Sequence, residues 1–202
     1  MIPDPDHRGW RKALFRLLRQ LAGACRTGVA AMILIFLSGL FLALCVFAAL
    51  HDVNRLTIPN WLNLTIAGLF VPAALVSGIP LEILGGHLLA GGLAFVIAVG
   101  LFAFRIFGGG DAKMIPAVVL WMGPAAAFPF VYWMAIVGGA CALFLLIGKR
   151  SFPAAAVPGF MRAPFEPKAG VPYGVAIAGG AIIAGSASPL LALFYESIGF
   201  AG

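Results

Sequence analysis

Long apolar stretches, separated by short polar connections, make up most of this chain. Most of the stretches reach the roughly 20 residues that an α-helix needs to cross about 30 Å of hydrocarbon. A continuous apolar run of this length is typical of a transmembrane helix. The pattern therefore predicts an all-α, polytopic membrane protein with about six transmembrane helices, at residues 29–50, 60–79, 81–104, 114–124, 127–147 and 171–197.

The composition excludes the soluble and the disordered classes of protein. Of the 202 residues, 62% are hydrophobic and 10% are charged, whereas soluble domains average about 25% charged residues. A globule of this size could not bury so much apolar surface, and disorder requires low hydrophobicity together with high net charge. The 26 glycines suit a helix bundle inside a membrane, because small residues let helices approach closely.

The cysteines and histidines give no sign of a metal or redox site. The three cysteines are dispersed and form no CxxC pair, which argues against a disulfide framework and a zinc site. The three histidines do not cluster with cysteines at ligand spacing. We therefore expect no metal and no cofactor. His87, inside the third span, is expected to be a hydrogen-bonded packing residue rather than a proton relay.

The basic residues of the connections predict which side of the membrane each connection faces. Seven Lys and Arg residues lie in the first, third and fifth connections, and none lies in the second, the fourth or the C-terminal end. Such an excess marks cytoplasmic loops. The membrane surface thus explains the net charge of +6, and nucleic acid is not an expected partner. The seven residues are Arg55, Arg105, Lys113, Lys149, Arg150, Arg162 and Lys168.

The fourth span is short, and its bounds are poorly defined by the pattern because Pro116 and the pair Gly123-Pro124 interrupt it. Two crossings between residues 113 and 148 agree with the charges. A single crossing would place the basic fifth connection on the opposite side of the membrane.

Residues 1–28 are expected to be a basic, amphipathic N-terminal extension ahead of a transmembrane domain at residues 29–202. The basic residues of the extension predict that it is cytoplasmic. A single crossing at residues 29–50 places it outside, because the connection after that span is itself predicted to be cytoplasmic. Three explanations stay open: an amphipathic segment on the outer interface, a chain start at Met32, and a signal peptide that ends near Ala49 and inverts the orientation of the other connections. The basic residues of the extension are Arg8, Arg11, Lys12, Arg16, Arg19 and Arg26.

Two of the seven acidic residues occupy positions that suggest function. Asp52 and Asp111 lie 59 residues apart, and each follows an odd-numbered span, so both are predicted to lie on the cytoplasmic face. Acidic groups at a membrane boundary are costly and often mark a functional site. The other five are expected to be solvated or interfacial charges: Asp4, Asp6, Glu82, Glu166 and Glu196.

Two aspartates that meet at a membrane edge can hydrolyse a peptide bond. Like charges a few ångströms apart do not both ionise easily, so such a pair holds one proton. The ionised carboxylate can take a proton from an attacking water, and the protonated carboxyl can polarise the peptide carbonyl and protonate the leaving amine. The titration belongs to the pair, so neither aspartate is assigned as the base. Two unrelated surface aspartates are the alternative.

The residues around both aspartates are compatible with this chemistry. Gly108, Gly109 and Gly110 allow a positive φ and the close approach of another backbone, which suits an extended peptide substrate or a tight turn before Asp111. No strand is expected before these glycines and no GK[ST] follows them, which argues against a phosphate-binding loop. Pro59 suits the first turn of the second span.

Three segments stand out together: DVNRLTIPN at residues 52–60, GGGDAKM at 108–114 with LWMG at 120–123, and VPYGVAIA at 171–178. Taken together, they resemble the aspartic prepilin peptidases (type IV leader peptidases), which are membrane proteases of the GxGD type. The segments occur in the order and at the spacing of that family. The short chain and the third segment look most like the peptidases of Tad-type (Flp, type IVb) pilus systems.

The resemblance implies catalytic roles for Asp52 and Asp111 at the cytoplasmic face of a bacterial inner membrane. The implied substrates are prepilins and pseudopilins whose short basic leader is cut just before a hydrophobic helix, and Tad-type pilus assembly machinery is an implied partner. The chain lacks the CxxC pairs and the inserted domain of bifunctional relatives, so N-methylation is not expected. The residues expected to bind substrate or shape the site are Pro59, Asn60, Gly108, Gly109, Gly110 and Lys113.

Two other functions stay open at this point. A small transporter or channel could use Asp52 and Asp111 to bind a cation or relay protons, although no acidic residue lies at the middle of a span. A non-catalytic pilus assembly factor is the second, although both aspartates and the GGGD turn are intact. Lys113 is expected to contact lipid phosphate or substrate, or to be a plain interfacial cation.

Overall fold

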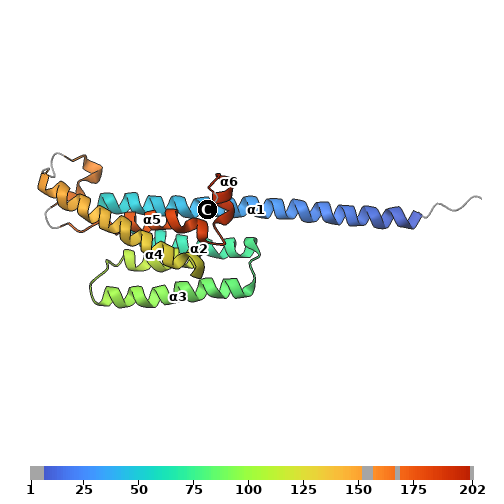
Figure 1. Cartoon of the computed structure of the whole chain (residues 1–202), viewed down its shortest axis with the longest axis horizontal. Coiled ribbons are helices and arrows are strands. Elements are labelled where there is room, and N and C mark those ends of the chain that lie inside the picture. The colour runs from blue at the N-terminus through green and yellow to red at the C-terminus, as the bar shows by residue number, and fades with distance from the viewer. Residues whose placement is uncertain (1–6, 152–156, 167–168, 201–202) are drawn as a thin grey trace, which may run out of the picture.

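The computed structural model describes residues 7–151, 157–166 and 169–200, with side chains from residue 28 onward except that of Phe160 (Figure 1). Within these ranges the chain is helical and has no strand, which confirms the predicted all-α class. Four of the helices in the described part of the chain are long and apolar enough to cross a membrane. The elements are α1 (His7–Arg55), α2 (Asn60–Ser77), α3 (Leu81–Ala103), α4 (Asp111–Ser151), α5 (Tyr173–Ala184) and α6 (Ala192–Ser197), with the 3-10 helices η2 (Gly159–Met161), η3 (Ala163–Phe165) and η4 (Gly185–Ala187).

The first three predicted spans correspond to the first three helices. The part of α1 that could cross a membrane is Gly28–Arg55. Pro59 and Pro80 directly precede α2 and α3, where a residue without an N–H leaves no donor unsatisfied. The amphipathic character predicted for residues 1–28 concerns side chains outside the described part of the chain, and it stays a prediction.

α4 reverses its direction at Gly123. This glycine has φ 65° and ψ −179°, a conformation open essentially to glycine alone, and Pro124 follows it. A first arm, residues 111–122, lies antiparallel to α3, and a second arm, residues 124–151, returns along α5 (Figure 1). The fourth and fifth predicted spans are therefore the two arms of one element, and a full crossing at residues 114–124 was a wrong prediction because the first arm is too short for it.

Side chains from neighbouring elements satisfy the carbonyls that the reversal exposes. Pro124 has no N–H, so the carbonyl of Leu120 loses its helical partner, and His87 Nδ1 lies 2.8 Å from that oxygen. The hydroxyl of Ser188 donates to the carbonyl of Trp121 at 2.7 Å. His87 is fully buried, which confirms the prediction that it is a hydrogen-bonded packing residue.

The first arm of α4 ends near the middle of the bundle. Its length of about 18 Å, at 1.5 Å per residue, is roughly half of the hydrocarbon thickness. Near its end, the ring of Trp121 stacks on Phe41 of α1 with the centroids 4.5 Å apart, and its N–H donates to the Ile66 carbonyl of α2 at 2.8 Å. The chain thus returns to the end where α4 began. The ends of α1, α3 and α4 all lie at this end of the bundle (Figure 1), as expected for odd-numbered connections that share one face.

The sixth predicted span is divided in the structure. α5 has 12 residues, η4 follows it, and α6 has only six residues. A continuous helix over residues 171–197 was therefore a wrong prediction. The pair Ser188-Pro189 explains the break, because proline disfavours a helical conformation at the residue before it.

α3 is the outermost of the long helices (Figure 1). It exposes large apolar side chains along its length, including Leu81 at 82%, Leu89 at 74% and Val96 at 67%. A soluble monomer rarely exposes so extended an apolar surface. Contact with lipid explains this surface, in agreement with a polytopic membrane protein.

Candidate active site

Asp52 lies in the last turn of α1, with 4% of its surface exposed. Its Oδ2 accepts a hydrogen bond of 2.8 Å from the backbone N–H of Gly174 in the first turn of α5. Pro172, which precedes α5, provides no side-chain cap, so Asp52 caps this helix from another element. The positive end of the α5 dipole also favours a negative charge at this point.

Asp111 is the first residue of α4, and its carboxyl lies against the backbone of Gly108. A Cβ at Gly108 would lie 2.9 Å from Oδ2 of Asp111, and a Cβ at Gly110 would lie 3.1 Å from the backbone nitrogen of Ile58. Gly109 has more room, with 3.4 Å to the nearest atom. None of the three glycines has a positive φ. Close approach, and not a left-handed backbone, is therefore what requires glycine here.

The structure brings the two predicted catalytic aspartates together. The carboxyls of Asp52 and Asp111 lie close enough to interact electrostatically. The ring of Phe107, just before the glycines, lies 5.9 Å from the ring of Tyr173 at the start of α5. The ends of α1, α4 and α5 thus meet around the two carboxyls, and the charge of Asp52 disfavours the ionised form of Asp111.

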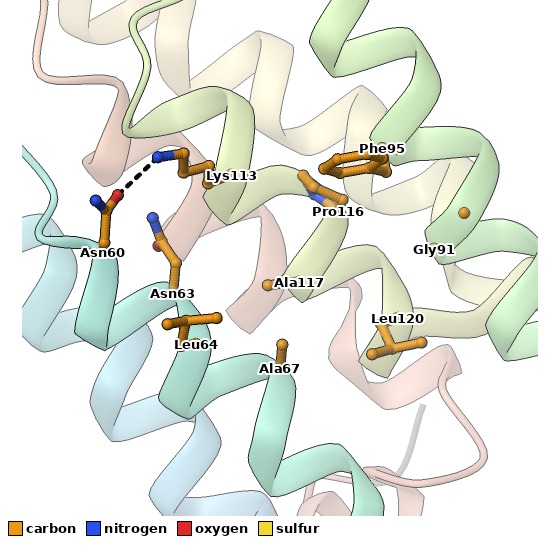
Figure 2. A pocket seen from close by; sticks show the side chains of 11 residues that line it. Asn60, Asn63, Leu64, Ala67, Gly91, Phe95, Lys113, Pro116, Ala117 and Leu120 are labelled. Carbon is orange, nitrogen blue, oxygen red and sulfur yellow. Dashed lines mark hydrogen bonds between the residues drawn. The ribbon is translucent and has the colours of Figure 1, made fainter.

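Three further predicted site residues, Pro59, Asn60 and Lys113, lie at the start of α2 and of the first arm of α4. Pro59 has an extended conformation and directly precedes α2. The ammonium of Lys113 donates to Oδ1 of Asn60 at 2.8 Å (Figure 2). This hydrogen bond joins α2 to α4 two residues after Asp111 and holds a positive charge beside the site.

Asn63 is a residue of this region that the sequence analysis missed. It is 5% exposed, and its Nδ2 donates to the carbonyl of Gly110 at 3.3 Å, directly before Asp111. Its Oδ1 is buried and has no hydrogen-bond partner. A signal for it exists in the sequence: a second amide lies three residues after Asn60, on the same face of an otherwise apolar helix.

His51, the histidine next to the candidate pair, contacts the backbone. Nδ1 of His51 lies 2.7 Å from the carbonyl oxygen of Thr57, in the connection after α1. In the described ranges, no group of three or more His, Cys, Asp and Glu side chains is placed to hold a metal ion. The expectation that the protein needs no cofactor stays a prediction.

Comparison with known proteins agrees with this geometry. The model of the type IV leader peptidase family matches residues 39–143, just over half of the chain. The matched region contains both aspartates and the three glycines, and it ends within the second arm of α4. No curated protein and no solved structure matches the chain significantly. Because the family model covers this much of the chain, the predicted family is confirmed, and the chain belongs to the type IV leader peptidase family.

Proposed function

We propose that this chain is an intramembrane aspartic endopeptidase that removes the leader from Flp-type prepilins and pseudopilins at the cytoplasmic face of the bacterial inner membrane. Its family acts on prepilin leaders. We propose three things beyond the family: the aspartic chemistry, the Flp-type substrates and cleavage at the cytoplasmic face. The observation that supports it most is the meeting of Asp52 and Asp111, which come from different helices, at one end of the bundle.

In the proposed reaction, the aspartate pair holds one proton. The ionised carboxylate removes a proton from water while the water oxygen attacks the carbonyl carbon of the scissile bond, and the protonated carboxyl gives its proton to the carbonyl oxygen. The C–N bond of the tetrahedral intermediate then breaks. The leaving amine takes the proton that the pair removed from the water. One of the two hydroxyls of the intermediate then gives its proton to the pair, and the new carboxyl group forms. Either aspartate can be the one that starts ionised.

The glycine turn supports the placement of the aspartate pair. Gly108 and Gly110 pack closely against Asp111 and Ile58, so any larger residue there would displace the carboxyl or the connection after α1. Glycine at these positions therefore keeps the Asp111 carboxyl in the place that the proposed reaction needs.

The basic residues support cleavage on the cytoplasmic side. Arg55, Arg105 and Lys149 follow or end the helices that terminate at the aspartate end of the bundle. By the distribution of Lys and Arg, this end faces the cytoplasm. The Flp subtype rests on the resemblance of residues 171–178, the segment in which α5 begins. Tad-type pilus assembly machinery is then the expected partner.

Co-expression with a candidate Flp-type prepilin tests the proposed function. We expect the prepilin to shift to its mature size on a gel when the protein is present, and N-terminal sequencing to place the new end just before the apolar helix. A transporter or a non-catalytic assembly factor leaves the prepilin uncut. An unshifted prepilin in membranes that contain the inserted protein contradicts the proposal.

A further inference from the structure

A groove lies beside the start of α4, between α2, α3 and the first arm of α4 (Figure 2). Its volume is about 600 Å³. Leu64 of α2 and Phe95 of α3 line it and are 73% and 53% exposed. The groove therefore opens on the apolar outer surface of the bundle, next to the aspartates.

The groove is polar at one end and apolar along the rest of its length. Asn60, Asn63 and Lys113 line the end next to the aspartates, whereas Ala67 and Leu120 line the part deeper in the bundle (Figure 2). An apolar helix that starts at the membrane surface and continues into the hydrocarbon matches this gradient.

Small residues form much of the groove wall. Ala67, Ala117, Gly91 and Gly92 all line it. A Cβ at Gly92 would meet no atom within 4 Å, so the space beside this residue is open. Small residues let the backbones of two helices approach closely and are typical of helix–helix contacts inside membranes.

Asn63 lacks a donor at the polar end of the groove. Its side chain is 5% exposed, and its amide oxygen has no hydrogen-bond partner. A buried acceptor without a donor is costly and rare. The first turn of any helix contains N–H groups that have no partner within the helix. A helix that begins beside Asn63 can supply the missing donor once the Asn63 side chain turns its amide oxygen toward the groove.

We infer that this groove docks the apolar helix that follows the scissile bond of the substrate, with the first turn of that helix beside Asn63. Lys113, held by Asn60 at the mouth of the groove, repels a basic leader and so keeps it out of the groove. The junction between leader and helix then lies next to the aspartates. The inference rests on the proposed function, for which it identifies the binding site of the substrate's apolar helix.

Photo-crosslinking tests this docking. A photoreactive residue replaces Phe95 in an Asp111→Asn background, which keeps the prepilin uncut, and wild-type protein is first shown to cleave the same prepilin. Val96 is the matched control, since it is the next residue on α3, is 67% exposed and does not line the groove. A photoreactive residue in place of Phe144 tests whether the substrate helix binds instead in a second apolar groove, of about 440 Å³, which Phe144 and Val53 line.

We expect a crosslink to the apolar helix of the prepilin from position 95 and little or none from positions 96 and 144. Equal crosslinking from position 96, stronger crosslinking from position 144, or labelling of lipid alone from position 95 overturns the inference. If wild-type protein does not cleave the prepilin at all, the proposed function itself fails, so the two failures are distinguishable.

A bulky residue in the groove gives a second test. Gly92→Leu fills the open space, and we expect it to lower the cleavage rate at least about tenfold by misplacing the substrate. Gly100→Leu is the matched control, because it makes the same change in the same helix, also meets no atom within 4 Å, and does not line the groove. The control should cleave within about twofold of wild type. Equal rates for the two variants contradict the docking of the substrate in this groove.

Discussion

The backbone N–H of Gly174 donates a hydrogen bond of 2.8 Å to the carboxylate of Asp52, and it joins the first turn of α5 to the last turn of α1. A Cβ at position 174 would lie 2.9 Å from Cβ of Asp52. Both residues belong to packed helices, so neither can move without shifting its helix. The position of the Asp52 carboxylate therefore depends on a glycine 122 residues further along the chain.

We expect Gly174→Ala to lower prepilin cleavage by about a hundredfold, since a displacement of about 1 Å in a catalytic group can cost that much. Alanine stabilises a helix interior by up to about 1 kcal/mol relative to glycine, so the loss does not come from helix propensity. Gly170→Ala is the control, because a Cβ there meets no atom within 4 Å. Cleavage is measured on co-expressed prepilin and normalised to inserted protein. Wild-type cleavage by Gly174→Ala would show that Asp52 does not need this contact.

Gly123→Ala is expected to destabilise the protein by about 1–3 kcal/mol, the usual cost of a strained backbone conformation. Its φ is 65°, and a Cβ there would lie 2.6 Å from the ring of His87. Gly139→Ala, in the second arm of α4, meets no atom within 4 Å and provides the control. Thermal unfolding in detergent measures both variants. Equal midpoints would mean that the reversal of α4 tolerates a side chain.

Local signals were sufficient to predict α2, α3 and the apolar part of α1. Long apolar runs define these helices, and Pro59 marks where α2 begins. The same signals placed Asp52 and Asp111 at one end of the bundle, because successive crossings and the charges of the connections determine the sides. The pair Gly123-Pro124 also marked a break in the chain.

Contacts between distant residues could not be predicted in this way. The geometry of the α4 reversal depends on His87 and Ser188, which cap exposed carbonyls from elsewhere in the chain. Asn63 acquires its place in the site only through the carbonyl of Gly110, in the turn before α4. The requirement for glycine at position 174 likewise arises from the approach of Asp52, and no local pattern specifies that approach.

A cysteine in place of Ser151 tests which side of the membrane the aspartates face. Ser151 is exposed at the end of α4, at the aspartate end of the bundle (Figure 1). We expect this cysteine to resist a membrane-impermeant thiol reagent in intact cells and to react after lysis, because the basic residues predict a cytoplasmic location. A cysteine at Ser77, at the opposite end of α2, is expected to react from outside. The native cysteines are replaced first: Cys25, Cys45 and Cys141.

Rapid labelling of position 151 in intact cells, together with protection of position 77, would place the aspartates on the outer side. Cleavage at the cytoplasmic face would then be wrong, although the aspartic chemistry could still hold.

Removal of metal ions is expected to leave cleavage unchanged. The described ranges contain no group of side chains placed to bind a metal, and the only histidine next to the pair, His51, contacts the backbone of Thr57. Purified protein is assayed before and after treatment with a chelator, with the detergent and lipid kept constant. Activity that is lost to the chelator and restored by zinc would show that the aspartates do not work alone.

Prepilin cleavage by Asp52→Asn and Asp111→Asn tests the central claim most directly. An asparagine keeps the shape of the side chain but cannot exchange a proton, so each variant should insert normally and lose nearly all activity. The double variant should be little worse than either one, since the two residues act as a unit. Glu82→Gln, which makes the same kind of change at an exposed acid at the start of α3, should retain wild-type cleavage. Substantial cleavage by either single aspartate variant would remove that residue from the catalytic pair and contradict the account.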